Sequence, residues 1–325
     1  METLRVGLCS WADSGLVKSG WYPAEARSAE RRLRFYALKF DTVEVDSTYY
    51  AIPGETAAWR WAARTPKGFL FNVKAFGLFT FHAVDRKQLP SWAQSVTRSH
   101  AVPDRLTLRD FSKSVLLEIW ESFRRSIAPL DATGKMGYLL FQFPPGIEFS
   151  RVLEKYLHRI REVSGPLRIA VEARNGKWLE GSAEDRFLGT LRELNMAYVA
   201  VDEPSLAWTV PPKWPITASW GSVVRFHGRN AAAWEKRGAG VSEKFRYLYK
   251  PEELHPWKNR ILETSARVER LFVMFNNCYG DYAARNASWM KKALGLSVQD
   301  AEAAQGMLDY GSAEEPKIPE KEERT

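Results

Sequence analysis

The sequence has few cysteine residues and no long apolar run. These absences argue against a disulfide-stabilised protein and against a membrane-spanning one. Cys9 and Cys278 are its only cysteines, too few for a disulfide framework and typical of a reducing cytoplasm. No stretch approaches the roughly 18 consecutive apolar residues that a membrane-spanning helix needs. The N-terminus passes directly into a strand pattern and lacks the basic-then-apolar order of a signal peptide. We therefore expect a cytoplasmic protein with no membrane partner.

Familiar cofactor and metal motifs are also missing. No glycine-rich phosphate loop follows the first apolar run, which argues against a dinucleotide-binding sheet. No His-x-His, His-Glu-x-x-His or paired-cysteine spacing occurs, so we expect no cofactor. A divalent metal such as zinc or manganese is the alternative, with Glu44, Glu172, His82 and His227 as its ligands.

What the chain does contain is apolar residues and positive charge. Its 325 residues are 45% hydrophobic and 13% aromatic, enough to bury a large core in one α/β barrel or in two smaller domains. The formal charge of +8 favours acidic partners, either small anions or nucleic acid. A basic protein that binds neither is the plainer alternative.

Short apolar runs that end in polar residues recur along the chain and predict eight β-strands. The runs are Leu4–Trp11, Thr42–Tyr50, Phe69–Lys74, Gly137–Phe143, Leu167–Arg174, Ala197–Asp202, Ser222–His227 and Leu271–Asn277.

Amphipathic helical patterns lie between many of these runs. They cover Ala29–Phe40, Thr56–Arg64, Ser112–Leu130, Ser150–Ser164, Ala183–Asn195 and Tyr282–Leu296. Strands that alternate with helices pair in parallel through right-handed crossovers. Eight such units predict a single-domain (β/α)8 TIM-type barrel over residues 1–296. A doubly wound open sheet is the alternative.

Two connections are long, one after the third strand and one after the seventh. They are Ala75–Lys135 and Gly228–Arg270, and such inserts in compact domains are usually functional or disordered. We expect the first to form a lid-like excursion. Residues 297–325 are rich in Glu, Lys, Ala and Pro and predict a charged, partly disordered tail.

The polar residues gather at the carboxyl end of the predicted strands, where the active site of a barrel lies. Side chains alternate faces along a strand, so Glu44 and Asp46 share one face, as do Glu172 and Arg174, and Arg225 and His227. Further polar residues end the other strands: Lys74, Gln142, Asp202, Asn276 and Asn277. The structural alternative is a set of paired ions buried inside the barrel.

Acids, bases and imidazoles in one ring suit acid–base chemistry on an anionic substrate. We assign catalysis to Glu44, Glu172, His227 and Lys74. Substrate binding is assigned to Arg174, Arg225, Arg229, Gln142, Asp202, His82, Asn276, Asn277, Asp46 and Tyr50. Glycoside hydrolysis by the Glu44–Glu172 pair is an alternative.

Two further features bear on fold and partners. Cys9 and Cys278 end the first and eighth strands, which are neighbours if the barrel closes, and we expect two small buried thiols. Tryptophans in loops or at helix starts could stack on bases or sugars, although packing is the commoner use of such rings. They are Trp11, Trp21, Trp59, Trp61, Trp178, Trp208 and Trp220.

A series of motifs, in one order, points to a known family. They are GLCSW (7–11), Trp21-Tyr22-Pro23, TVEVDSTYY (42–50), W-x-x-x-TP-x-x-F-x-F-x-VK (61–74), FTFH (79–82), LLFQFPP (139–145), VEARN (171–175), VD-x-P (201–204), RFHGR (225–229) and FNN (275–277). Over about residues 4–295 the chain resembles the domain-of-unknown-function-72 family, also called YecE-like.

The resemblance implies a TIM-type barrel with these residues around its mouth, and it supplies no reaction. The matching positions are Glu44, Lys74, His82, Gln142, Glu172, Arg174, Asp202, Arg225, His227, Arg229, Asn276 and Asn277. The chain departs from the family pattern at Asp46, where Asn is usual, and at Asn175, where His is usual. The segment Ser91–Asp110 is expanded.

The hypothesis that best joins these observations is a hydrolase-like enzyme acting on a small phosphorylated or otherwise anionic substrate. Glu172 or Glu44 would be the base and His227 the acid, while Lys74 and the arginines would hold the anion. A nucleic-acid-binding protein or nuclease is the second hypothesis, and a ligand-binding scaffold without catalysis is the third.

Overall fold

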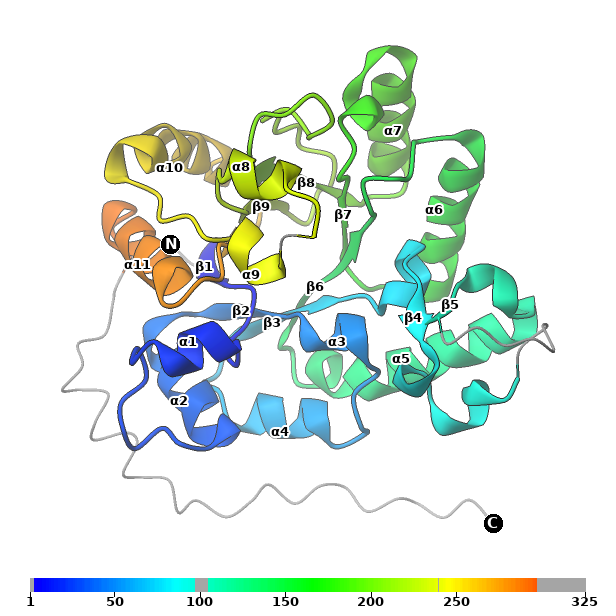
Figure 1. Cartoon of the computed structure of the whole chain (residues 1–325), viewed down its shortest axis with the longest axis horizontal. Helices are drawn as coiled ribbons and strands as arrows, with labels where there is room; N and C mark the ends of the chain where they lie inside the picture. Colours follow the sequence, from blue (N-terminus) through cyan, green and yellow to red (C-terminus); the bar gives the residue numbers. More distant parts are fainter. Residues whose placement is uncertain (1–2, 97–104, 239, 297–325) are drawn as a thin grey trace.

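Eight parallel strands close into a barrel in the computed structural model, which describes residues 3–96, 105–238 and 240–296 (Figure 1). Around the barrel the strands follow the order β1-β10-β9-β8-β7-β6-β3-β2. They are β1 (Leu4–Leu8), β2 (Thr42–Val45), β3 (Leu70–Lys74), β6 (Met136–Gln142), β7 (Ile169–Glu172), β8 (Ala197–Asp202), β9 (Ser222–Phe226) and β10 (Leu271–Phe275). The predicted (β/α)8 TIM-type fold is confirmed.

Helices surround the barrel and cover the outward side chains of the strands. The longer ones are α2 (Ala29–Lys39), α4 (Ala57–Ala63), α5 (Lys113–Ala132), α6 (Arg151–Ser164), α7 (Gly181–Glu193), α10 (Pro251–Ser265) and α11 (Tyr282–Ala293). Serine side chains cap three of them, because Ser28, Ser112 and Ser150 each accept a hydrogen bond from a first-turn backbone amide. These caps account for the predicted helix starts. Within the described residues the β8–β9 connection contains no helix.

The two predicted long connections carry small elements of their own. After β3 the chain forms η1 (Gly77–Thr80), the antiparallel pair β4 (Val84–Asp85) and β5 (Arg105–Leu106), and the short 3-10 turns η2 (Arg86–Gln88), η3 (Ser91–Gln94) and η4 (Leu108–Asp110). After β9 come α8 (Ala231–Glu235) and α9 (Val241–Lys244), which lie across the open end of the barrel in Figure 1. The remaining short helices are α1 (Ser14–Lys18), α3 (Ser47–Tyr50) and η5 (Gly176–Leu179).

Two of the predicted segments fall wholly or partly beyond these ranges. The charged tail, residues 297–325, lies outside the described residues. The expanded segment Ser91–Asp110 is described only in part, because residues 97–104 are also outside. Within the described ranges, no helix combines the length and apolar character that crossing a membrane requires.

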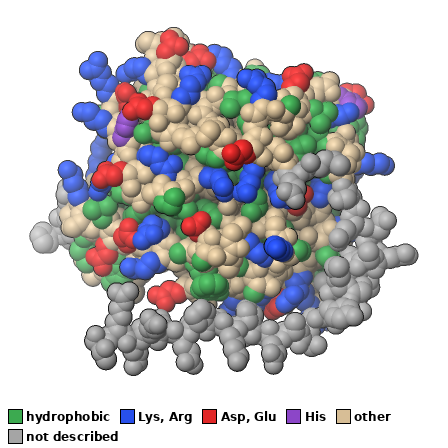
Figure 2. All heavy atoms as spheres, turned by 180° about the vertical axis from the view of Figure 1, so that it is seen from behind, with side chains coloured by type: hydrophobic (Ala, Val, Ile, Leu, Met, Phe, Trp, Pro, Cys, Tyr) green, Lys and Arg blue, Asp and Glu red, His purple; other side chains and the backbone are tan. Residues whose placement is uncertain are grey.

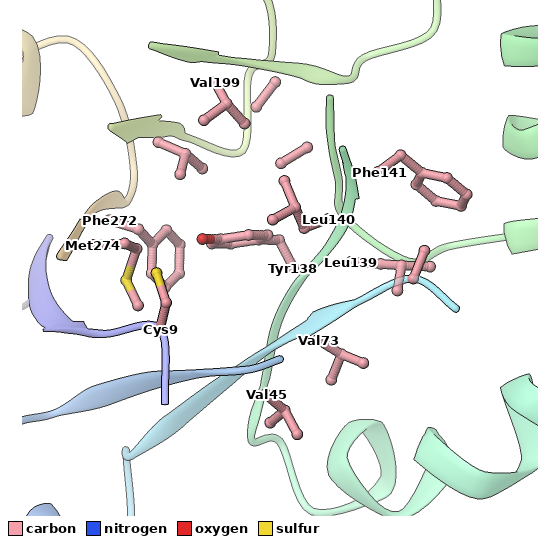
Figure 3. Packing of buried hydrophobic residues seen from close by; sticks show 14 of the residues in the cluster. Cys9, Val45, Val73, Tyr138, Leu139, Leu140, Phe141, Val199, Phe272 and Met274 are labelled. Carbon is pink, nitrogen blue, oxygen red and sulfur yellow. The ribbon is translucent and has the colours of Figure 1, made fainter. Parts of the chain in front are cut away.

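The barrel interior is filled by large apolar side chains below the polar end (Figure 3). The Tyr138 ring meets the Phe272 ring edge-on, with centroids 5.0 Å apart. Two strands approach their neighbours closely where they carry glycine. A Cβ at Gly7 would lie 2.0 Å from the Thr42 carbonyl oxygen, and one at Gly137 would lie 2.0 Å from Asn72 Oδ1. Glycine therefore allows these pairs of strands to pack.

Six of the eight strands end earlier than predicted, β1 and β2 by the most. β1 stops at Leu8, and β2 stops at Val45 instead of Tyr50. Asp46 takes helical backbone angles, φ −72° and ψ −23°, and begins α3. The Thr48 hydroxyl stabilises this turn by donating to the carbonyl oxygens of Val45 (2.7 Å) and Lys74 (2.6 Å), a local bond that competes with the strand ladder. The polar motifs therefore belong to turns just beyond the strands.

Candidate functional site

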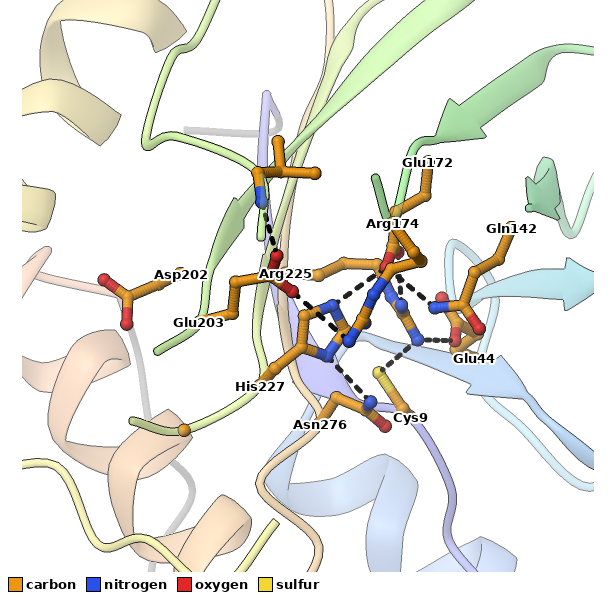
Figure 4. A network of polar contacts seen from close by, with 12 residues as sticks. Cys9, Glu44, Gln142, Glu172, Arg174, Asp202, Glu203, Arg225, His227 and Asn276 are labelled. Carbon is orange, nitrogen blue, oxygen red and sulfur yellow. Dashed lines mark hydrogen bonds and ion pairs between the residues drawn. The ribbon is translucent and has the colours of Figure 1, made fainter. Parts of the chain in front are cut away.

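The guanidinium of Arg225 is the centre of a buried polar network at the carboxyl end of the barrel (Figure 4). Arg225 lies on β9 and has no exposed surface. It donates to Glu172 Oε2, to Glu44 Oε1 (2.5 Å) and to the Cys9 sulfur (3.4 Å). Two carboxyl groups, from strands β2 and β7, therefore share one cation. Attraction to both helps to raise the pKa of Arg225 even though burial acts to lower it.

Glu172 is the most fully hydrogen-bonded acid of this network. Besides Arg225, its Oε1 accepts from Gln142 Nε2 (2.7 Å), Arg174 (3.1 Å) and His227 Nε2 (2.9 Å). Burial acts to raise its pKa, but Arg225, His227 and Arg174 outweigh burial and hold the pKa of Glu172 well below its usual range. Glu172 is thus a fixed negative charge, because four donors occupy its two oxygens.

Glu44 has a different environment although it shares the same guanidinium. Its second oxygen accepts from the Tyr138 hydroxyl, at 3.3 Å. Burial, opposed in part by Arg225 and reinforced by the nearby carboxylate of Asp46, raises the pKa of Glu44 to about 7. The two carboxyl groups therefore differ in charge state near neutral pH. A pair of acids separated in this way is typical of proton-transfer sites.

His227 is held as a neutral imidazole between two partners. Its Nε2 lies 2.9 Å from Glu172 Oε1, and its Nδ1 lies 2.9 Å from Asn276 Nδ2. Because the amide must donate to Nδ1, the proton belongs on Nε2, which donates to Glu172. Burial first, and then repulsion from Arg174, lower the pKa of His227 to about 3. His227 orients Asn276 and Glu172 and is poorly suited to donate a proton to substrate.

Arg174 joins the network to a carboxyl group that the sequence reasoning did not assign. Its guanidinium lies 3.1 Å from Glu172 and 3.2 Å from Glu203 Oε2, and stacks at 4.9 Å over the Trp234 ring. Burial raises the pKa of Glu203 to about 7, although Arg174 acts in the opposite direction. The only sequence signal was an acid directly after β8, in the motif that Pro204 closes.

A cleft of about 710 Å³ lies above this network, at the mouth of the barrel. Of the predicted site residues, seven line it: Asp46, Tyr50, Lys74, His82, Gln142, Arg174 and Asn276. Glu44, Glu172, Arg225 and His227 have no exposed surface and lie beneath it. The predicted gathering of polar residues at one end of the barrel therefore forms two layers, a buried network and the polar wall of a cleft.

Lys74 is a cation of the cleft wall that retains hydrogen-bonding capacity. Its ammonium lies 3.6 Å from Asp46 Oδ1 and 4.9 Å from the centre of the Tyr49 ring. The His82 ring meets the same tyrosine edge-on at 5.1 Å. Burial, followed by repulsion from Lys74, lowers the pKa of His82 to about 4. At neutral pH the imidazole beside Lys74 is therefore uncharged.

Three predicted site residues do not join the network or the cleft. Asp202 accepts two bonds from Arg229 (2.8 and 2.6 Å), one from Tyr249 (2.6 Å) and one from Trp257 (2.6 Å). In Figure 4 it points away from the other side chains. The strand register explains this, because Asp202 pairs with Phe226 whereas Val201 pairs with Arg225. Asp202 therefore faces the outer helices and lies outside the cleft, and its assignment to the substrate stays a prediction.

Arg229 and Asn277 also lie outside the network and the cleft, and their assignment to the substrate stays a prediction. Arg229 binds Asp202, and Asn277 donates to the Tyr247 carbonyl oxygen (2.8 Å) and to Asn286 (2.9 Å). The turn just before Arg229 is tight, because Gly228 has φ +85° and a Cβ there would lie 2.7 Å from Tyr247 Cβ. Glycine at position 228 therefore allows this turn to pack against Tyr247, in the long connection between β9 and β10.

The two alternative chemistries fit this geometry poorly. In the glycosidase alternative a sugar would lie between Glu44 and Glu172, but the Arg225 guanidinium binds both carboxyl groups there. The same cation would repel a divalent metal from these ligands. Among the described residues no group of three or more His, Cys, Asp or Glu side chains is arranged to hold a metal ion.

The two cysteines and the seven tryptophans singled out in the sequence divide between the cleft and the core. β1 pairs with β10, so that Leu8 lies opposite Phe275, and the strand ends that carry Cys9 and Cys278 are neighbours as expected. Both cysteines are free; Cys9 is buried, whereas Cys278 is half-buried and lines the cleft. Of the seven predicted tryptophans, Trp11 and Trp208 also line it. Trp21, Trp61, Trp178 and Trp220 pack in or against the core, and Trp59 is half-buried.

The comparisons with known proteins agree with this architecture. A family described as "Protein of unknown function DUF72" matches residues 5–308. The chain belongs to the DUF72 family. The UPF0759 protein YunF of Bacillus subtilis (strain 168) is 28% identical over 297 residues, which are 90% of this chain and 95% of YunF.

Solved structures of DUF72 proteins show the same fold. One from Enterococcus faecalis V583 has a TM-score of 0.74 and 29% identity, and the match covers 91% of this chain and 97% of that one. One from Thermotoga maritima MSB8 has a TM-score of 0.70 and 31% identity, over 90% and 99% of the two chains. These likenesses establish the family and the fold and name no reaction, so the function of this DUF72 protein must be argued from its site.

Proposed function

We propose that this DUF72 protein is a hydrolase-like enzyme that uses a buried proton donor to cleave a small anionic ester, a phosphate ester above all, in the cleft at the barrel mouth. The observation that carries the proposal is the Glu44–Asp46 pair. It couples a carboxyl group whose pKa is raised to about 7 to a carboxylate that lines the cleft beside Lys74.

Anion binding is assigned to Lys74 and Arg174. Lys74 has one carboxylate at 3.6 Å and a side chain that is 12% exposed, so its ammonium retains donors for a ligand. Arg174 is held by two acids at 3.1 and 3.2 Å and by the Trp234 ring. A guanidinium fixed in this way offers its remaining N–H groups in one orientation.

The cleft walls favour a substrate with a flat ring. Trp208 and Trp234 stack with centroids 5.8 Å apart, and both line the cleft together with Trp11, Tyr49 and Phe245. Aromatic side chains bind flat rings and exclude water without requiring a particular arrangement of polar groups on the ligand. An aryl or heterocyclic ester of phosphate combines this ring with the anion that Lys74 and Arg174 would hold.

The proton path differs from the sequence-based hypothesis. Glu172 and His227 would position Gln142, Arg174 and Asn276 at the base of the cleft. Glu44 would hold the proton, and Asp46 would pass it to the substrate. Water attacks the phosphorus, the bond from phosphorus to the leaving oxygen breaks, and that oxygen takes the proton. Water then supplies the proton that restores Glu44.

Replacement of Lys74 tests the anion site. We expect Lys74→Gln to weaken binding of p-nitrophenyl phosphate by about 10- to 100-fold, because a charge-assisted hydrogen bond contributes about 1.5–3 kcal/mol. Quenching of tryptophan fluorescence from the cleft reports the affinity. Lys155→Gln, an exposed lysine on α6, is the matched control for loss of charge.

Equal affinity in Lys74→Gln and Lys155→Gln would place the anion elsewhere and contradict the proposal. Tight binding without turnover of any ester in a panel would instead favour a ligand-binding scaffold that has no catalytic activity.

A further inference from the structure

Three arginines come together at the opposite, amino-terminal end of the barrel. Arg5 lies on β1, and Arg168 and Arg270 directly precede β7 and β10. Arg5 pairs with Phe272, a residue whose ring packs against Tyr138 inside the barrel (Figure 3). Because strand side chains alternate, Arg270, two residues before Phe272, shares that inward face.

Arg168 reaches the same place from the other side. It precedes the inward-facing Glu172 by four residues along β7, which again preserves the face. In the barrel order β1-β10-β9-β8-β7, the strands β1 and β7 stand across the barrel from each other. The side chains of Arg5 and Arg168 therefore converge on the barrel axis, with Arg270 beside Arg5. We call these three residues the floor cluster.

The floor cluster has no salt-bridge partner among the described residues. None of its three arginines takes part in an ion pair there, in contrast to Arg225 at the mouth, which binds two carboxylates. Arg5 Nε is buried and has no hydrogen-bond partner. Burial, followed by repulsion from Arg168 and Arg5, lowers the pKa of Arg270, and the nearby Glu269 only partly opposes this. Like charges gathered without a partner are costly unless a ligand compensates them.

We propose that the floor cluster is a second, distinct binding site for a phosphate-class oxyanion. Tetrahedral oxyanions accept hydrogen bonds on several sides at once, which suits guanidinium groups that arrive from two sides of the barrel. Figure 2 shows this face of the molecule, where blue Lys and Arg side chains lie near its centre. The layer of Tyr138 and Phe272 separates the site from the mouth. The anion is either a free phosphate or a phosphate group of nucleic acid.

Arginine side-chain NMR of the full chain tests the site directly. Addition of inorganic phosphate is expected to shift the Nε–Hε signals of Arg5, Arg168 and Arg270 with one common dissociation constant. Arg270→Gln should weaken that binding at least tenfold. The same variant relieves repulsion within the cluster, so it should fold with an unchanged or higher melting temperature.

Two matched variants separate this site from others. Lys74→Gln removes a mouth cation and Arg124→Gln removes an exposed arginine of α5, and neither should change the floor affinity. A short single-stranded oligonucleotide that displaces phosphate from the three arginines identifies nucleic acid as the source, and failure to displace it identifies a small anion. Absence of the arginine shifts, or equal affinity in Arg270→Gln and Arg124→Gln, would overturn the proposal.

Discussion

Replacing Arg225 with glutamine is expected to lower the free energy of unfolding by about 3–5 kcal/mol. The change leaves Glu44 and Glu172 buried on either side of a neutral amide, and an uncompensated buried charge carries a penalty of that size. Both acids have no exposed surface, so water cannot take over the role of the guanidinium. Urea denaturation followed by circular dichroism measures the loss.

Two controls show whether the loss comes from charge balance. Arg124→Gln, at an exposed ion pair with Glu121 on α5, should change stability by no more than about 0.5 kcal/mol. The triple variant E44Q/E172Q/R225Q removes the guanidinium together with the two acids that it binds, and it should be more stable than Arg225→Gln alone. An Arg225→Gln protein that is as stable as wild type would mean that the Arg225 network does not stabilise the carboxyl end of the barrel.

Replacing Glu44 with glutamine is expected to reduce turnover of p-nitrophenyl phosphate by about 10²–10⁴-fold, the usual contribution of a general acid. The introduced amide resembles the protonated carboxyl group in shape and charge, so affinity for the ester should change little. A large fall in kcat with a nearly constant KM is therefore the expected signature. Turnover equal to wild type in a folded Glu44→Gln protein would remove Glu44 from the mechanism.

The pH profile provides the control for this assignment. Glu44 must be protonated to act, so kcat should fall as the pH rises through the folded pKa of about 7. Asp46→Asn removes a negative charge that helps to raise the pKa of Glu44. Its turnover should fall because Asp46 passes the proton, and the alkaline limb of the remaining activity should move to lower pH, whereas Lys155→Gln should change neither. A profile that Asp46→Asn does not move would separate Glu44 from the reaction.

The fold could be predicted from the sequence because its evidence is local and repeated. Eight apolar runs recur along the chain, and amphipathic segments lie between most of them, so that most units carry their own signal. The ends of the strands could not be placed as well. Threonine favours strands, so Thr48 was placed in one. Its hydroxyl bonds to Val45 and Lys74, which stabilise the turn instead, form only after two strands have come together.

The sequence placed the candidate site at the correct end of the barrel. It did not show which residues form the buried network and which line the cleft. Alternation along one strand places Glu172 and Arg174 together, yet it says nothing of the register between strands. That register sends Asp202 outward and Arg225 inward. Glu203 was missed for a related reason, because its role depends on Arg174 reaching it from the neighbouring strand β7.

A ¹³C NMR titration of the Glu44 and Glu172 carboxyl carbons tests the central claim most directly, that one guanidinium holds two acids in different charge states. The account predicts that Glu44 gains its proton near pH 7, while Glu172 stays ionised well below the ordinary glutamate pKa of 4.5. Two carboxyl groups that titrate together near that ordinary value would contradict it.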